Sequence, residues 1–211
     1  VQISAIVYAQ LAAPAEAVAY FLALRLIQLV SVFSQAPFYS KLPAMASLYA
    51  AGETDRVIDL ARRGMRLSYA SFLMAFAALE LLGAPILDYV GSNADFPAPA
   101  LWHLMGIAFF IERFGAMHIN LYSVTHQIVN HVANGVAGLL HIVIAIAAFG
   151  TLQSLAFPLA LLLGNLLFYA PYAARHSYSA FNLGFFRFES SVMIPWALLL
   201  ALYSAQVNLV S

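Results

Sequence analysis

Residues 67–90 read LSYASFLMAFAALELLGAPILDYV, in which Glu80 is the only charged side chain before Asp88. A helix that crosses a hydrocarbon core of about 30 Å needs about 20 mostly apolar residues. This stretch therefore predicts a transmembrane helix. The whole chain has the same character, because 64% of its 211 residues are hydrophobic and 9% are charged, whereas about 25% are charged in soluble domains.

Apolar segments bounded by Pro, Gly and charged residues predict further spans on both sides of this one. The seven candidates are residues 1–12, 17–42, 67–90, 98–122, 127–149, 152–173 and 191–210. Pro37 and Pro43 predict kinks near the end of the second span. We expect an all-α polytopic bundle of six to seven spans, with antiparallel neighbours because the loops are short. The chain starts within an apolar segment, so we interpret residues 1–211 as one transmembrane bundle that is a fragment of a longer protein.

The interval between the second and third spans is polar. Residues 52–66 read GETDRVIDLARRGMR, with apolar residues at helical spacing beneath the charges. They predict a short amphipathic interfacial helix in a cytoplasmic loop at about 51–66. Apart from Arg25 and Arg113, the basic residues lie in or beside this loop and the one before the last span: Lys41, Arg56, Arg62, Arg63, Arg66, Arg175 and Arg187. Excess Lys and Arg mark cytoplasmic loops, so we expect both loops to lie on one side of the membrane.

Several function classes find no support in the composition. The formal net charge is zero, without the basic excess of a nucleic-acid-binding protein. Cysteine is absent, and the six His residues lack the spacing of a zinc helix, so we expect neither a metal nor a cofactor. A Gly-rich phosphate loop and a serine nucleophile elbow are also missing. We therefore expect a protein that is not an enzyme.

Four charged residues lie inside predicted spans: Arg25, Glu80, Glu112 and Arg113. Each costs several kcal/mol in a membrane unless it faces the bundle interior, a partner or water. One interpretation is that Glu80 pairs with Arg25 or Arg113 and only fixes helix packing. The other is that these residues line an aqueous cavity and contact a charged or sugar-bearing substrate. Glu80 or Glu112 is also a candidate to carry a coupling proton or cation.

The span at 127–149 contributes a second polar set: Asn130, His131, Asn134 and His141. Asn130, Asn134 and His141 are spaced i, i+4 and i+11, which predicts a shared helix face. Together with other polar residues nearby they suggest a hydrophilic wall of the cavity. Those neighbours are His118, Asn120 and His126. For each residue alone, a hydrogen bond to an adjacent helix remains the alternative.

Four segments carry a family resemblance. They are residues 17–68 from AVAYFLALRL to RRGMRLS, GSNADF at 91–96, ERFGAMHINLYSVTHQIVNHVANGVAG at 112–138, and GNLLFYAPYAARHSYSAF at 164–181. In this order they resemble the polysaccharide transporter, or oligosaccharidyl-lipid flippase, family. Its superfamily also includes multidrug and toxin extrusion (MATE) transporters and the lipid II flippase. The resemblance covers nearly all of this chain and about the second half of a typical member.

The resemblance implies two six-helix bundles around a central cavity and alternating access in the bacterial inner membrane. The implied cargo is an undecaprenyl-pyrophosphate-linked oligosaccharide, an O-antigen unit of lipopolysaccharide or an exopolysaccharide repeat. Implied further partners are membrane lipids and other polysaccharide assembly proteins. By position, Arg25 resembles the arginine of the family's eighth helix, whereas residues 191–210 are supernumerary to a six-helix half.

Three alternatives stay open from the sequence. An ion-coupled multidrug exporter of the same superfamily would have acidic residues dominating its cavity. A membrane polymerase or ligase of lipid-linked glycans would carry a large periplasmic loop, whereas the predicted far-side loops are short. A non-transporting scaffold within a polysaccharide export assembly is the third.

Overall fold

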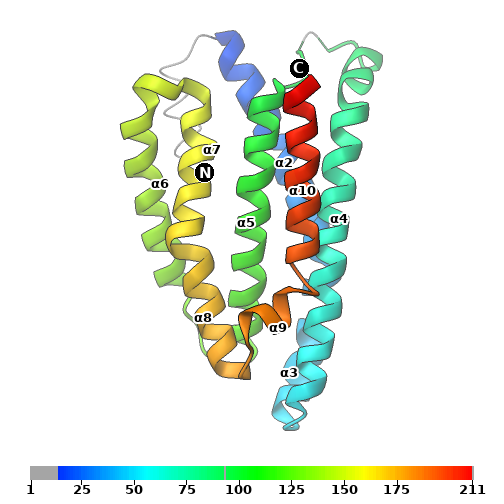
Figure 1. Cartoon of the computed structure of the whole chain (residues 1–211), viewed down its shortest axis with the longest axis vertical. Helices are drawn as coiled ribbons and strands as arrows, with labels where there is room; N and C mark the ends of the chain where they lie inside the picture. Colours follow the sequence, from blue (N-terminus) through cyan, green and yellow to red (C-terminus); the bar gives the residue numbers. More distant parts are fainter. Residues whose placement is uncertain (1–13, 93, 211) are drawn as a thin grey trace.

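The computed structural model describes residues 14–92 and 94–210, and this part of the chain is helical without a strand. The helices run up and down one long axis as a bundle (Figure 1), so the predicted all-α class is confirmed there. The first predicted span, residues 1–12, lies outside the described residues. The α-helices are α2 (Pro14–Tyr39), α3 (Leu42–Ala50), α4 (Thr54–Tyr89), α5 (Pro99–Ser123), α6 (Asn130–Leu152), α7 (Ala156–Gly164), α8 (Ala170–Phe181), α9 (Phe185–Glu189) and α10 (Ile194–Val210).

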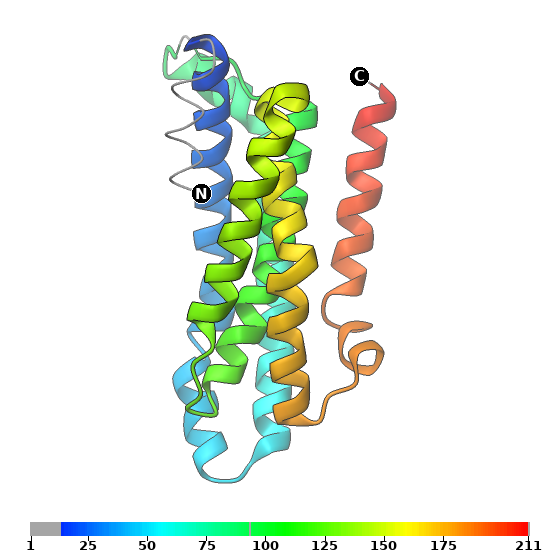
Figure 2. The ribbon, with the colours of Figure 1, turned by 90° about the vertical axis from the view of Figure 1, so that its left-hand side faces the viewer.

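Three helical stretches are long and apolar enough to cross a membrane: Ala17–Ala50, Thr54–Tyr89 and Asn130–Phe181. The last one comprises α6, α7 and α8, and it reverses direction where Gln153 adopts a φ of 47°. Helix α6 therefore lies antiparallel to α7 and α8 (Figure 2). Length and composition indicate membrane helices, and the number of crossings stays a prediction.

Helix α4 joins two elements that the sequence predicted separately. Its 36 residues give a length of about 54 Å at about 1.5 Å per residue, well beyond a hydrocarbon core of about 30 Å. The separate interfacial helix predicted at 52–66 is therefore wrong, because the basic segment forms the first turns of α4. Gly64 lies within α4 without interrupting it. A Cβ there would lie 3.2 Å from the Phe38 backbone, so the glycine allows α4 to approach α2 closely.

Helix α5 is the centre of the bundle. It packs on α2, α7 and α8, and more lightly on α4 and α10. Aromatic rings fill the core beside it: Phe76 stacks on Trp102 with ring centroids 4.9 Å apart. A Cβ at Gly106 would come within 2.4 Å of the Phe76 ring, so the glycine is required for this close approach.

A π-helical segment, Asn165–Tyr169, connects α7 to α8. Pro171 follows it and has no N–H to donate to the carbonyl four residues earlier. The interrupted hydrogen-bond ladder explains why the backbone widens there. The predicted span 152–173 therefore continues without a break into α8, which remains helical as far as Phe181.

The two predicted basic loops lie at the same end of the bundle, the lower end in Figure 1, where α3, α8 and α9 meet. The Arg62 guanidinium carbon lies 5.5 Å from the ring centroid of Phe188. Arg62 and Arg187 also line one cavity of about 510 Å³. The expectation that both loops share one end is confirmed, and the side of the membrane stays a prediction.

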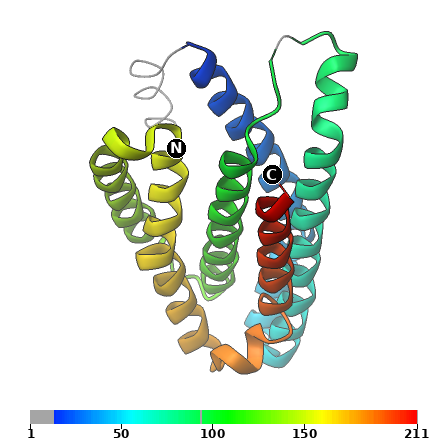
Figure 3. The same ribbon diagram turned by 45° about the horizontal axis from the view of Figure 1, so that its top comes forward.

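The bundle has two edges that differ in packing. At one edge, α6 packs on α7 and the π-helical segment. At the other, α10 stands beside α4 and α5 (Figure 3). Predicted kinks at Pro37 and Pro43 correspond to the last turn of α2 and the first turn of α3, so the chain bends between these helices.

Candidate functional site

Central helix α5 carries the main concentration of buried polar side chains. His103, Arg113 and His118 are each at most 3% exposed, and Glu112 and Asn120 are half-buried. Their hydrogen bonds reach α2, α4, α8, α9 and α10. The helix that fills the core is therefore also the helix that the polar contacts hold in place.

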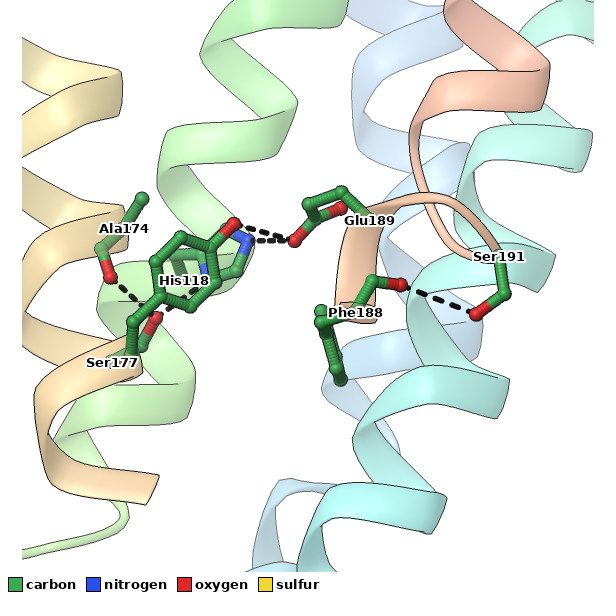
Figure 4. Close-up of polar contacts among 7 residues, drawn as sticks. His118, Ala174, Ser177, Phe188, Glu189 and Ser191 are labelled. Carbon is green, nitrogen blue, oxygen red and sulfur yellow. Dashed lines mark hydrogen bonds and ion pairs between the residues drawn. The ribbon is translucent and has the colours of Figure 1, made fainter. Parts of the chain in front are cut away.

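His118 is the centre of a network in which His118 and Glu189 are both fully buried (Figure 4). Its Nδ1 lies 2.6 Å from Ser177 Oγ on α8. Its Nε2 lies 3.0 Å from Glu189 Oε1 on α9, and the Tyr178 hydroxyl donates to the same oxygen at 2.8 Å. The ring of Phe114 covers the imidazole, with centroids 4.5 Å apart. The network thus joins three helices inside an aromatic enclosure.

The hydrogen bonds determine how many protons this network holds. Ser177 Oγ donates its one proton to the Ala174 carbonyl at 3.1 Å, so His118 Nδ1 is the donor to Ser177. Nε2 then faces the Glu189 carboxyl group, and a hydrogen bond between them requires one further proton. The His118–Glu189 pair is therefore neutral as a whole. A neutral, hydrogen-bonded pair is what a buried site can tolerate.

His103 repeats this arrangement nearer the other end of α5. Its Nδ1 lies 3.0 Å from Ser204 Oγ on α10, and its Nε2 lies 2.9 Å from Glu80 Oε1 on α4. Rings of Phe76 and Tyr203 flank it, each with centroids 5.6 Å away. Both networks place a serine oxygen at Nδ1 and a glutamate at Nε2.

Neither network has the geometry of a serine hydrolase triad. In such a triad the serine bonds Nε2 and the acid bonds Nδ1, the reverse of the contacts at His118. Ser177 is also fully buried, and its hydroxyl is bound to a helix carbonyl. The arrangement therefore supports a structural or proton-holding role and not nucleophilic catalysis.

Arg113 joins α5 to α2 in a third contact. Its Nη2 donates to the Ser31 carbonyl at 2.8 Å and to the Ser31 hydroxyl. Further along α5, Asn120 donates to the Tyr39 hydroxyl at 3.0 Å. Glu112 Oε2 is buried and makes no hydrogen bond in the described part of the chain. The two neighbouring charged residues thus differ: Arg113 has a partner on α2, whereas Glu112 Oε2 has none in the described part of the chain.

The structure does not bring Arg25, Glu80 and Arg113 together. The predicted pairing of Glu80 with either arginine is wrong, because His103 is its partner. Arg113 is held by a serine of α2. Arg25 lies on the exposed side of α2, and no hydrogen bond or ion pair joins it to the described residues.

The four polar residues predicted on α6 also differ in their exposure. His141 is 7% exposed and packs in a stripe with Ala133, Ala137 and Ala145. Asn130 is half-buried, whereas His131 and Asn134 are exposed. The predicted common face of Asn130, Asn134 and His141 is therefore wrong at Asn134, which the packed stripe leaves outside.

The sequence prediction missed His103 and Glu189, the histidine of one buried network and the glutamate of the other. His103 is an ionisable group inside a predicted span, the same signal that identified Glu80. Glu189 lies between predicted spans, so its sequence position gave no sign of burial; α9 folds back and places it at 0% exposure. Among the described residues, no three His, Asp or Glu side chains are grouped closely enough to hold a metal ion.

Comparison of the chain with protein families, with characterised proteins and with solved structures gave no match.

Proposed function

We propose that the chain is the C-terminal bundle of a membrane transporter that moves a lipid-linked oligosaccharide across the bacterial cytoplasmic membrane. Residues resembling the oligosaccharidyl-lipid flippase family support the cargo. The helical bundle and its apolar, membrane-length helices support the membrane setting.

One observation carries the transport proposal: Arg25 is exposed in the middle of an apolar helix. Leu29 and Val32, which follow at helical spacing, are also exposed, at 52% and 62%. A guanidinium that faced lipid at this depth would cost several kcal/mol. Facing water instead, Arg25 marks this side of α2 as one wall of an aqueous path.

The charges on the open faces favour an anionic or hydroxyl-rich cargo. Arg25 on α2 and His131 and Asn134 on α6 are exposed. Residues 17–39 and 130–152 contain no Asp or Glu. A cavity for small organic cations would need carboxylates on such faces. A guanidinium and amide groups instead suit a pyrophosphate and sugar hydroxyls.

The buried networks have a different part in this proposal. The contacts of His103, Arg113 and His118 are enclosed in the bundle and hold α2, α4, α8, α9 and α10 around α5. In this proposal the buried contacts stabilise the helix packing, and the exposed faces of α2 and α6 contact the cargo.

Transport is testable in proteoliposomes that contain the full-length transporter and a lipid-linked oligosaccharide with a fluorophore on the sugar. A membrane-impermeant quencher outside the vesicles reports the rate at which the sugar crosses. We expect Arg25→Ala to slow crossing by about tenfold or more, the effect of losing one charge-assisted contact of about 1.5–3 kcal/mol. Arg63→Ala is the matched control, because Arg63 is an exposed arginine in the basic first turns of α4.

Equal crossing rates for Arg25→Ala and the unsubstituted protein would contradict the assignment of Arg25 to the path. No protein-dependent crossing at all would contradict the cargo.

An ion-coupled exporter of the same superfamily is a second candidate, favoured by the proton held between His118 and Glu189. It predicts proton flux driven by a cationic drug and unaffected by lipid-linked sugar. A pH-sensitive dye inside the vesicles separates the two candidates.

A further inference from the structure

A polar pocket lies at the basic end of the bundle, between α3, the loop from α5 to α6, and α8. It encloses about 350 Å³, which is in the range of small-ligand sites. The side chains that give it its chemistry are Tyr49, Tyr122, Gln127, Arg175, His176 and Ser179. The lining has a cation and hydrogen-bonding groups and no carboxylate.

Local geometry orients these groups. His176 Nδ1 donates to the Tyr172 carbonyl at 2.8 Å, which leaves Nε2 available at the pocket. Tyr122 donates to Gln127 Oε1, so the amide nitrogen of Gln127 stays available as a donor. His126, between the two loop residues that line the pocket, has a φ of 64°. Such left-handed residues are costly and concentrate at binding sites.

An apolar groove begins where the polar pocket ends. It encloses about 560 Å³ along α5, α8 and the segment leading to α10. The residues that define it include Ile111, Phe114, Leu166, Ala170, Phe185 and Met193. Arg175 lines the groove as well as the polar pocket. Arg175 is therefore the residue at which the polar and the apolar cavity adjoin.

This juxtaposition matches an amphiphile. A charged, hydroxyl-bearing headgroup fits donors without a carboxylate, and a guanidinium binds phosphate oxygens in pairs. A hydrocarbon chain fits a groove without charge except at its mouth. The other cavity at the basic end lacks this selectivity, because it contains Asp55 and Asp59, and Arg62 is already bound to Asp59 at 2.8 Å.

We propose that the polar pocket and the apolar groove together bind one lipid whose headgroup is a phosphorylated sugar, with Arg175 at the phosphate and the lipid chain between α8 and α9. The proposal rests on the proposed function for its choice of a sugar headgroup. It adds a site that is distinct from the path at Arg25: a docking site for the lipid at the basic end of the bundle.

The test measures binding without transport. The purified chain is placed in phosphatidylcholine vesicles with a photoactivatable polyprenyl-diphosphate-N-acetylglucosamine as the probe. We expect saturable cross-linking that unlabelled probe competes away. Polyprenol, which lacks the phosphate, and glucose 1-phosphate, which lacks the chain, should compete at least about tenfold more weakly, since each meets half of the site.

Matched variants locate the two halves. Arg175→Ala should weaken binding by about tenfold or more, whereas Arg187→Ala, in the other cavity at this end, should leave it unchanged. Leu166→Asn in the groove should weaken binding, and Leu198→Asn on α10, where Leu198 is also exposed, should not. Neither target is in the core, so both variants should keep the wild-type melting temperature.

Unchanged cross-linking in Arg175→Ala and Leu166→Asn would overturn the proposal. Equal competition by glucose 1-phosphate would reduce the site to a pocket for free sugar phosphates, which also overturns it. Arg25→Ala should bind the probe normally, so a loss of transport with retained cross-linking separates failure at the path from failure at this site.

Discussion

Replacing His118 with leucine should destabilise the bundle far more than the loss of an ordinary interhelical hydrogen bond. The substitution leaves the Glu189 carboxylate at 0% exposure, with the Tyr178 hydroxyl as its remaining partner in the network. Removing one partner of a buried charged pair costs about 3–5 kcal/mol. Neutral interhelical hydrogen bonds in membranes average about 0.6 kcal/mol. The two magnitudes are well separated, so the measurement distinguishes a buried acid–base pair from an ordinary interhelical hydrogen bond.

The matched experiment repeats the substitution in a Glu189→Gln background. Glutamine removes the stranded charge and can still accept a hydrogen bond from Tyr178. We therefore expect His118→Leu to cost only about 1–2 kcal/mol there, the scale of a hydrogen bond. The difference between the two backgrounds should be at least about 1 kcal/mol, within the range of coupling energies of contacting residues.

Reversible unfolding in mixed detergent micelles, monitored by circular dichroism, gives these free energies of unfolding. A coupling energy below about 0.5 kcal/mol, the usual additivity error, would refute the claim that His118 and Glu189 share a proton in one buried acid–base pair.

Further substitutions test side-chain packing and a helix end in the same unfolding assay. His103→Leu should cost less than His118→Leu, about 1–3 kcal/mol, because its glutamate partner keeps 15% of its side chain exposed; an equal cost would contradict this ranking by burial. Gly115→Ala should cost about 1–3 kcal/mol by overpacking, because the new Cβ would lie 2.4 Å from the Tyr169 ring. The control Gly135→Ala should be neutral or stabilising, because its new Cβ would have no atom within 4 Å. Asn182→Gly should stabilise by about 0.5–1 kcal/mol, because residue 182 ends α8 with a φ of 51° that glycine adopts freely; a loss of stability would show that the asparagine side chain contributes more than the backbone.

Long apolar segments were predictable because a span is defined by its own residues. The predicted segment 98–122 became α5, Pro99–Ser123, and 127–149 became α6, Asn130–Leu152. The continuity of α4 was not predictable from hydropathy. A change from polar to apolar surroundings at Arg66 marks a membrane boundary and does not interrupt backbone hydrogen bonds, so the helix passes through it.

The candidate site was only partly predictable, because partners are chosen by tertiary packing. The sequence identified Glu80 and Arg113 as buried charges but could not show that a histidine and a serine would satisfy them. Glu189 was missed because its burial depends on α9 folding back onto α5 and α8, a contact between segments 71 residues apart. Helical spacing likewise placed Asn134 with His141, whereas the packed alanine stripe of α6 left Asn134 exposed.

Arg25 is proposed to face water inside the membrane. Chemical labelling of a cysteine at this position tests that proposal most directly. The chain contains no cysteine, so a single Arg25→Cys variant has no background labelling. In native membranes, a charged, membrane-impermeant thiosulfonate should modify Arg25→Cys and the exposed basic-end control Arg63→Cys. It should not modify Ile146→Cys on α6, where the isoleucine is 70% exposed and is expected to face lipid. Modification of Arg63→Cys without modification of Arg25→Cys would contradict the account, because Arg25 would then face lipid or protein and not an aqueous path.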